Sequence, residues 1–130
     1  MGKIKQPLNK KGKVPSSATV VKTTAKPSVG WELLDETVVA LTDVEREFFQ
    51  TMVKTLKILC SLPWTDVSSY KGLGLDRVPE SSMKFPIPAK LNKDHLYHIK
   101  VSRGGRLWGY RDGDVFELVW LDPLHRVTPE

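Results

Sequence analysis

Side chains suited to proton transfer and phosphate binding recur at alternate positions late in the chain. His98 can exchange a proton near neutral pH, Lys100 is a compact cation, and the planar guanidinium of Arg106 matches two phosphate oxygens. Tyr110 and Glu117 add a phenol and a carboxylate. Successive side chains of a strand point to opposite faces, so these groups act together only if the strands that carry them share one face.

The segment from residue 98 to residue 122 has the pattern of three consecutive β-strands joined by two glycine turns. Gly104-Gly105 and Asp112-Gly113 accept the positive φ that tight hairpins need, and each pair lies between runs of β-branched and aromatic residues. A two-residue loop at the second turn pairs Leu107 with Leu118. The sequence therefore predicts an antiparallel meander.

The first turn of this meander allows two registers. A two-residue loop places His98 and Lys100 among the leucines, whereas a three-residue loop over 103–105 places Ile99 and Val101 there. Burying an unpaired lysine costs on the order of several kcal/mol, so we expect the three-residue loop. The predicted packing face holds Leu107, Gly109, Phe116, Leu118 and Trp120. The predicted polar face holds His98, Lys100, Ser102, Arg106, Trp108, Tyr110 and Glu117.

The region before the meander is predicted to be helical and then irregular. Thr42-Asp43-Val44-Glu45 has the form of a capping box, and apolar residues follow at helical spacing. This pattern predicts a helix over residues 43–62, which Pro63 ends. The run 31–41 fits either a first strand or a short helix. Residues 63–92 hold four prolines and two glycines, so we expect mainly loop, with one helical turn near 66–70.

The net charge of +5 comes from the first thirty residues. They contain seven lysines and no acidic residue, with many Pro, Ser, Thr and Gly, so residues 1–30 are predicted to form a disordered arm. Such an arm either attracts RNA or DNA or has no role beyond extending the chain. Residues 31–130 are mildly acidic and are expected to form a single domain.

Several kinds of site and location are excluded. No run of about eighteen apolar residues exists, so no membrane span is predicted, and we expect a cytoplasmic protein. The single cysteine, Cys60, excludes an internal disulfide and is expected to be a small buried apolar residue rather than a nucleophile. Asp94, His95 and His98 do not converge on a strand. No metal site and no small-molecule cofactor are predicted.

Two segments of the second half resemble the RelE/ParE toxin superfamily of bacterial toxin–antitoxin systems. Gly105-Arg106-Leu107-Trp108-Gly109-Tyr110 resembles the strand that bears an arginine in this family. Leu121-Asp122-Pro123-Leu124-His125-Arg126-Val127 resembles the terminal strand that ends in His-Arg. The resemblance covers residues 31–130. It implies a RelE-like α+β fold, with an N-terminal helix or helices packed on one face of a small twisted antiparallel sheet whose other face binds the target.

The resemblance also implies a toxin that inhibits translation by cleaving messenger RNA on the ribosome and is silenced by a cognate antitoxin. Cleavage through the 2′-hydroxyl of the RNA needs a base, a cation for the phosphate and an acid, and needs no metal. Arg106 is expected to clamp the phosphate or else to pair with Glu117. His125 is expected to act as acid or base, assisted by Lys100 or His98. The alternative is a non-catalytic protein-binding module or a gyrase inhibitor of the ParE kind.

Aromatic side chains and further arginines complete the predicted RNA contacts. Trp108 and Tyr110 can stack on an unpaired base or pack within the sheet, and packing is the expected role of Trp108. The pair Asp122-Pro123 is expected to end the last strand. Where the family often has a tyrosine, this chain has Thr128. The predicted RNA-binding residues are Arg103, Tyr110, Trp108, Arg126 and Arg111.

Overall fold

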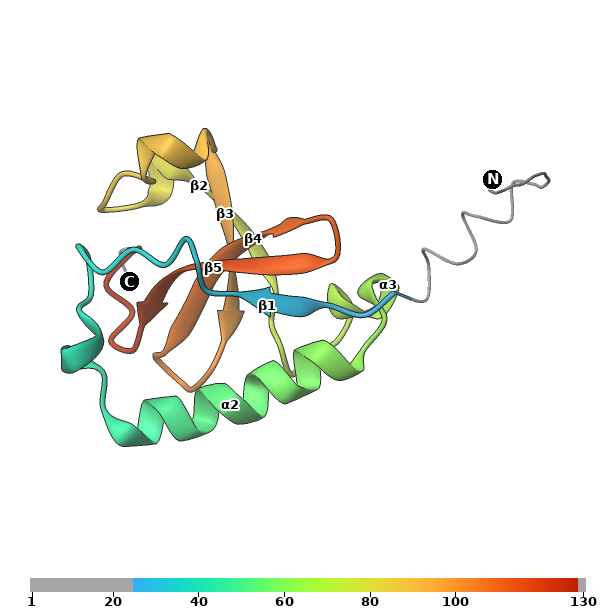
Figure 1. The fold of residues 1–130 in the computed structure, drawn as a ribbon. Coiled ribbons are helices and arrows are strands. Elements are labelled where there is room, and N and C mark those ends of the chain that lie inside the picture. The colour runs from blue at the N-terminus through green and yellow to red at the C-terminus, as the bar shows by residue number, and fades with distance from the viewer. Residues whose placement is uncertain (1–24, 129–130) are drawn as a thin grey trace.

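One five-stranded sheet organises the part of the chain that the structure describes, residues 25–128 of a computed structural model (Figure 1). The strand order across the sheet is β1-β5-β4-β3-β2. β1 pairs parallel with β5, and every other pair is antiparallel, so the sheet is mixed. The strands are β1 Ser28–Gly30, β2 Asp76–Pro79, β3 His95–Lys100, β4 Arg106–Asp112 and β5 Val115–Asp122.

The predicted fold class is wrong. The first element is a strand instead of a helix, and the two α-helices of residues 25–128, α2 (Arg46–Ser61) and α3 (Trp64–Val67), follow it. β1 has only three residues, too few for period-two alternation to be read, and its pairing with β5 is a tertiary contact. The sheet is therefore mixed instead of wholly antiparallel, and the described fold is not RelE-like.

The folded region begins before the expected boundary at residue 31. The Ser28 amide donates to the Asp114 carbonyl at 3.0 Å and β1 lies at the edge of the sheet, so the last residues of the expected arm belong to the fold. The rest of that predicted arm, residues 1–24, lies outside the described part. The run 31–41 forms neither a strand nor an α-helix; it is a series of turns that leads into a 3-10 turn at Leu41–Asp43.

α2 lies along one face of the sheet, close to the place where the sequence predicts a helix (Figure 1). It begins at Arg46 because the preceding 3-10 turn uses the expected capping residues, and its N-cap Glu45 makes no side-chain capping bond. Its buried residues pack on the sheet: Phe48, Met52, Thr55 and Leu59. Cys60 is half-buried, and burial raises the pKa of its thiol. None of the described helices has both the length and the apolar character that crossing a membrane requires.

The antiparallel meander is present, with its first turn longer than predicted. Lys100 pairs with Arg106 and Ile99 with Leu107, so five residues, 101–105, connect β3 to β4. The shift of two residues from the expected register preserves the alternation of faces. Ile99 and Val101 therefore lie in the core as expected, and His98 lies on the other face.

A β-bulge in β5 makes the predicted packing face wrong at the end of that strand. Leu118 pairs with Gly109 and Trp120 pairs with Trp108, so Val119 is an extra residue of β5. One inserted residue reverses the side-chain alternation beyond it. Leu121 consequently packs under α2, and Trp120, expected there, lies on the opposite face.

The face opposite α2 is covered over its middle. Between β2 and β3 the chain makes a long excursion, drawn yellow to orange in Figure 1, whose apolar side chains pack on the sheet. They cover a second buried cluster formed by Val78, Leu96, Trp108, Tyr110, Val119 and Trp120. Because this face is buried at its centre, its polar side chains lie toward the ends of the sheet.

Candidate active site

The four antiparallel strands bring their chemically active residues to one end of the sheet. β2 begins at Asp76, β3 ends at Lys100, β4 begins at Arg106 and β5 ends at Asp122. Asp76 pairs with His98 on the neighbouring strand, and Arg106 pairs with both Lys100 and Asp122. The turn after β5 carries His125. We call this group the strand-end cluster: Asp76, His98, Lys100, Arg106, Asp122 and His125.

His98 is held by ring packing and faces a carboxylate. Its ring lies edge-on to Trp108, with 4.9 Å between ring centroids. Nε2 is 3.7 Å from Oδ2 of Asp76, and the His98 side chain is 16% exposed against 69% for Asp76. Nδ1 is buried with no hydrogen-bond partner among the described residues. Of the two ring nitrogens, Nε2 is therefore the one that faces an exposed polar group.

The surroundings of His98 keep its imidazole neutral. Burial is the largest cause that lowers the pKa of His98 below its ordinary value, and the charges of Arg106 and His125 lower it further. The carboxylates of Asp76 and Asp122 oppose this shift without reversing it. A neutral imidazole at pH 7 can accept a proton, which is what a general base requires.

Arg106 is anchored to the turn that precedes it. Its Nη1 donates to the carbonyl oxygens of Ser102 at 3.1 Å, Arg103 at 3.4 Å and Gly105 at 2.9 Å. Its Nε is buried without an acceptor among residues 25–128. Glu117, the expected alternative partner, lies opposite Tyr110 in the ladder. The Nη2 edge of the guanidinium is left for a ligand such as phosphate.

Asp122 and His125 define the turn that closes the cluster. Asp122 is fully buried, and it ends β5 as the sequence predicts. Its Oδ1 accepts the Arg126 amide at 2.7 Å, and its Oδ2 accepts the Val127 amide at 3.1 Å. His125 has φ = +58°, a left-handed conformation that few non-glycine residues adopt. Sequence reasoning missed this role, although an aspartate before a proline at a strand end is a turn signal.

The predicted stacking residues are not available to a base. Trp108 is completely buried, which confirms packing as its role and excludes stacking. Tyr110 is also buried, and Nζ of Lys93 lies 4.5 Å from its ring centre. Burial, with the charges of Glu117 and Asp112, raises the pKa of the Tyr110 phenol. Both rings lie beneath the excursion that covers this face.

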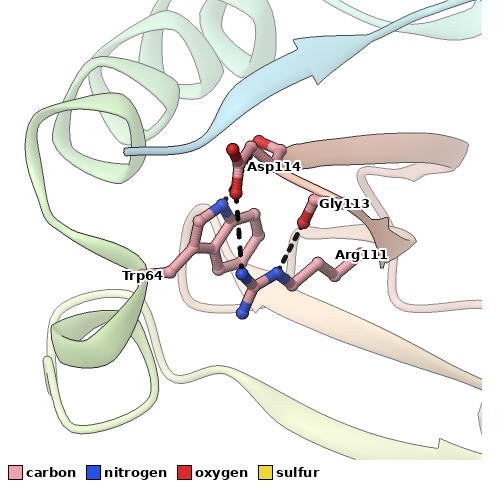
Figure 2. Close-up of polar contacts among 4 residues, drawn as sticks. All are labelled: Trp64, Arg111, Gly113 and Asp114. Atoms are coloured by element: carbon pink, nitrogen blue, oxygen red, sulfur yellow. Dashed lines mark hydrogen bonds and ion pairs between the residues drawn. The ribbon is translucent and has the colours of Figure 1, made fainter. Parts of the chain in front are cut away.

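Arg111 lies near the last residue of β4, at the end of the strand opposite Arg106, and Figure 2 shows it beside Trp64, Gly113 and Asp114. Its guanidinium carbon is 4.2 Å from the centre of the Trp64 ring, and its Nε donates to the Gly113 carbonyl at 2.7 Å. Five residues of strand separate it from Arg106, about 17 Å at the usual rise. Strand alternation also turns it toward α3, so Arg111, predicted to bind RNA, lies outside the strand-end cluster. Arg103 and Arg126 are exposed next to the cluster.

The charge of the described region is segregated along the chain. Residues 84–111 contain seven Lys or Arg and one acid, whereas residues 32–47 contain six acids and one Arg. Although the net charge of residues 31–130 is mildly acidic, residues 84–111, which include β3 and β4, are basic. Lys84 of this segment is held beside the last turn, because its amide donates to the Val127 carbonyl at 2.6 Å.

Potential metal-ligand side chains do not cluster in the described part of the chain. Within residues 25–128 no three or more His, Cys, Asp or Glu side chains gather closely enough to hold a metal ion. No protein-family model matches the chain, and neither a curated protein nor a solved structure matches it. The interpretation of the site therefore rests on its own residues.

Proposed function

We propose that this chain is an endoribonuclease that cleaves RNA through attack by the RNA's own 2′-hydroxyl, with the strand-end cluster as its active site. The observation that carries the proposal is the position of His98 at the strand ends, where its ring packs on Trp108, its Nε2 faces Asp76, and Arg106 pairs with the neighbouring Lys100. A neutral imidazole, a second imidazole and a guanidinium supply the base, acid and charge stabilisation that this reaction needs. All four predicted catalytic residues lie in this cluster.

Each side chain has a defined part in the proposed reaction. Nε2 of His98 takes the proton of the 2′-hydroxyl, and the 2′-oxygen forms a bond to phosphorus. The bond from phosphorus to the 5′-oxygen breaks, and His125 gives that oxygen its proton. The products are a 2′,3′-cyclic phosphate and a free 5′-hydroxyl. Nη2 of Arg106, with Lys100 beside it, stabilises the additional negative charge of the pentavalent phosphate.

The cellular role proposed for this activity is inhibition of translation, as the toxin of a toxin–antitoxin pair. Two short segments, 105–110 and 121–127, support this role by their resemblance to the toxin superfamily. The same segments supply Arg106 and His125 to the cluster. The ribosome with its messenger RNA is the proposed substrate complex, and a cognate antitoxin is the proposed inhibitor.

A second candidate function is a non-catalytic protein-binding module. It is favoured by Leu124, whose residue is 76% exposed immediately before His125. Leu124 borders a cavity of about 320 Å³ that Phe48 and Pro123 also line, with Asp43, Glu45 and Glu47 around it. The cavity combines apolar and acidic lining residues. It therefore fits a partner peptide that carries an apolar side chain next to basic residues. This candidate predicts binding without any cleavage of RNA.

The pH dependence of cleavage tests the proposed function and the role of His98 together. The base must be unprotonated, so the rising limb of the kcat/KM profile should have its midpoint below about pH 6.5, the ordinary pKa of histidine, because burial lowers the pKa of His98. Purified protein is incubated with single-stranded RNA, with and without ribosomes, and the products are separated at each pH. Absence of products in both arms favours the binding module.

His98→Gln is the control for this profile. The variant should lose about 100-fold or more in rate, and its residual activity should not titrate in the same range. The unfolded chain binds a proton at His98 more readily than the native chain does, so stability falls as the pH falls below about 6.5. Circular dichroism at each pH confirms that the protein is folded. An unchanged profile in His98→Gln would exclude His98 as the base.

A further inference from the structure

Asp122 is the one charged side chain in the described region that is fully buried. Burying a carboxylate is costly unless hydrogen-bond donors compensate for the lost water. Three N–H groups do so here: the amides of Arg126 and Val127, and the indole Nε1 of Trp108 at 3.2 Å. The carboxylate therefore joins two separate parts of the structure.

Those two parts carry the two histidines of the strand-end cluster. The Trp108 ring, fixed through its Nε1, is the surface against which the His98 ring packs. The amides of Arg126 and Val127 follow His125 directly, so their bonds to Asp122 hold the turn in which His125 takes its left-handed conformation.

We propose that Asp122 is the positioning residue of this site, one buried carboxylate that sets the separation of the His98 and His125 imidazoles. This role rests on the proposed function, because separation matters only if the two rings act on one substrate. Proton transfer at two atoms of a single phosphodiester demands both rings in place at once. A displacement of 1 Å in such a geometry costs about 100-fold in rate.

Asp122→Asn tests the proposal with a side chain of the same shape. An amide offers one oxygen and one NH₂ group, so it cannot accept from all three donors in either orientation. We expect kcat for RNA cleavage to fall about 100-fold, with KM changing less than about threefold, because Arg106 and Lys100 still bind the phosphate. Asp112→Asn, an exposed change at the far end of β4, is the matched control and should alter neither constant.

Two outcomes of this comparison overturn the proposal. If Asp122→Asn lowers the unfolding midpoint but leaves kcat of the folded protein unchanged, the residue has a structural role alone. If KM rises together with the loss of kcat, the change has loosened the whole cluster, including the phosphate contacts.

Trp108→Phe and hydrogen exchange keep the proposal testable if Asp122→Asn does not fold. Phenylalanine keeps a ring against His98 but removes one of three donors, so a loss in kcat of about tenfold is expected, and no loss contradicts the proposal. In the wild-type protein without RNA, the amides of Arg126 and Val127 should be protected from exchange. Unprotected amides overturn the positioning role. A wild-type protein that cuts no RNA but protects these amides instead contradicts the proposed function.

Discussion

Replacing Arg106 with alanine is expected to reduce RNA cleavage by about 1000-fold while leaving the protein folded. In the proposed reaction the guanidinium makes the main contact with the growing charge of the phosphate, and removing such a donor raises the barrier without affecting the base. Its hydrogen bonds to turn carbonyls are half-exposed, so their loss costs about 1 kcal/mol of stability. Arg106→Lys keeps the charge but loses the planar fork and should recover part of the rate.

Primer extension on transcripts of cells that express each variant measures this effect. Wild-type protein should produce new 5′ ends within translated codons, and Arg106→Ala should produce none above background. Arg111→Ala is the matched control, because that arginine lies over Trp64 at the opposite end of β4 and should leave the cleavage pattern intact. New ends of equal intensity in Arg106→Ala would show that Arg106 takes no part in cleavage.

Gly109→Ala is expected to destabilise the fold by about 3 kcal/mol, enough to unfold a marginal domain. Gly109 lies at the β-bulge, where an added Cβ would overlap the backbone carbonyl oxygen of Glu117 and approach Cε2 of Phe116 at 2.9 Å. A backbone atom within a paired strand cannot move aside as a flexible side chain can. The clash therefore breaks either the bulge or the packing of Phe116.

Gly104→Ala is the control for this prediction, because an added Cβ there meets no atom within 4 Å. We expect its stability to lie within about 0.5 kcal/mol of wild type. Urea denaturation followed by circular dichroism gives the free energy of unfolding of both variants. Equal stabilities for the two alanine variants would mean that the β4 and β5 backbones do not approach as described.

The elements that could be predicted from sequence are those whose pattern repeats locally. The apolar spacing of α2 and the glycine turns of the meander each specify an element within one stretch of chain. β1 and β2 could not be predicted in this way, because strands of three and four residues next to prolines owe their existence to the partner strand. The bulge at Val119 was equally hidden, since no glycine marks the extra residue.

The types of residue in the candidate site could be predicted from sequence, but their burial and their hydrogen-bond partners could not. Once Ile99 is assigned to the core, the alternation of side chains along β3 fixes the face of every other residue of the strand. His98 and Lys100 were therefore predicted on the correct face. The long excursion between β2 and β3 buries Trp108 and Tyr110, and nothing within β4 itself predicts that cover. Asp122 was identified as the end of a strand, but its three donors come from segments that meet only in the folded chain.

The most direct test of the central claim is cleavage of RNA that carries a single 2′-deoxy substitution. The purified protein, with ribosomes if these prove necessary, is given a short message and a copy that lacks the 2′-hydroxyl at the mapped site. In reactions without ribosomes, our account predicts that EDTA leaves cleavage of the unmodified message unchanged; reactions with ribosomes keep Mg²⁺ and omit the chelator. It also predicts that the product ends in a 2′,3′-cyclic phosphate and that the deoxy copy remains uncut at that position. Cleavage of the deoxy copy at the same position would contradict the mechanism.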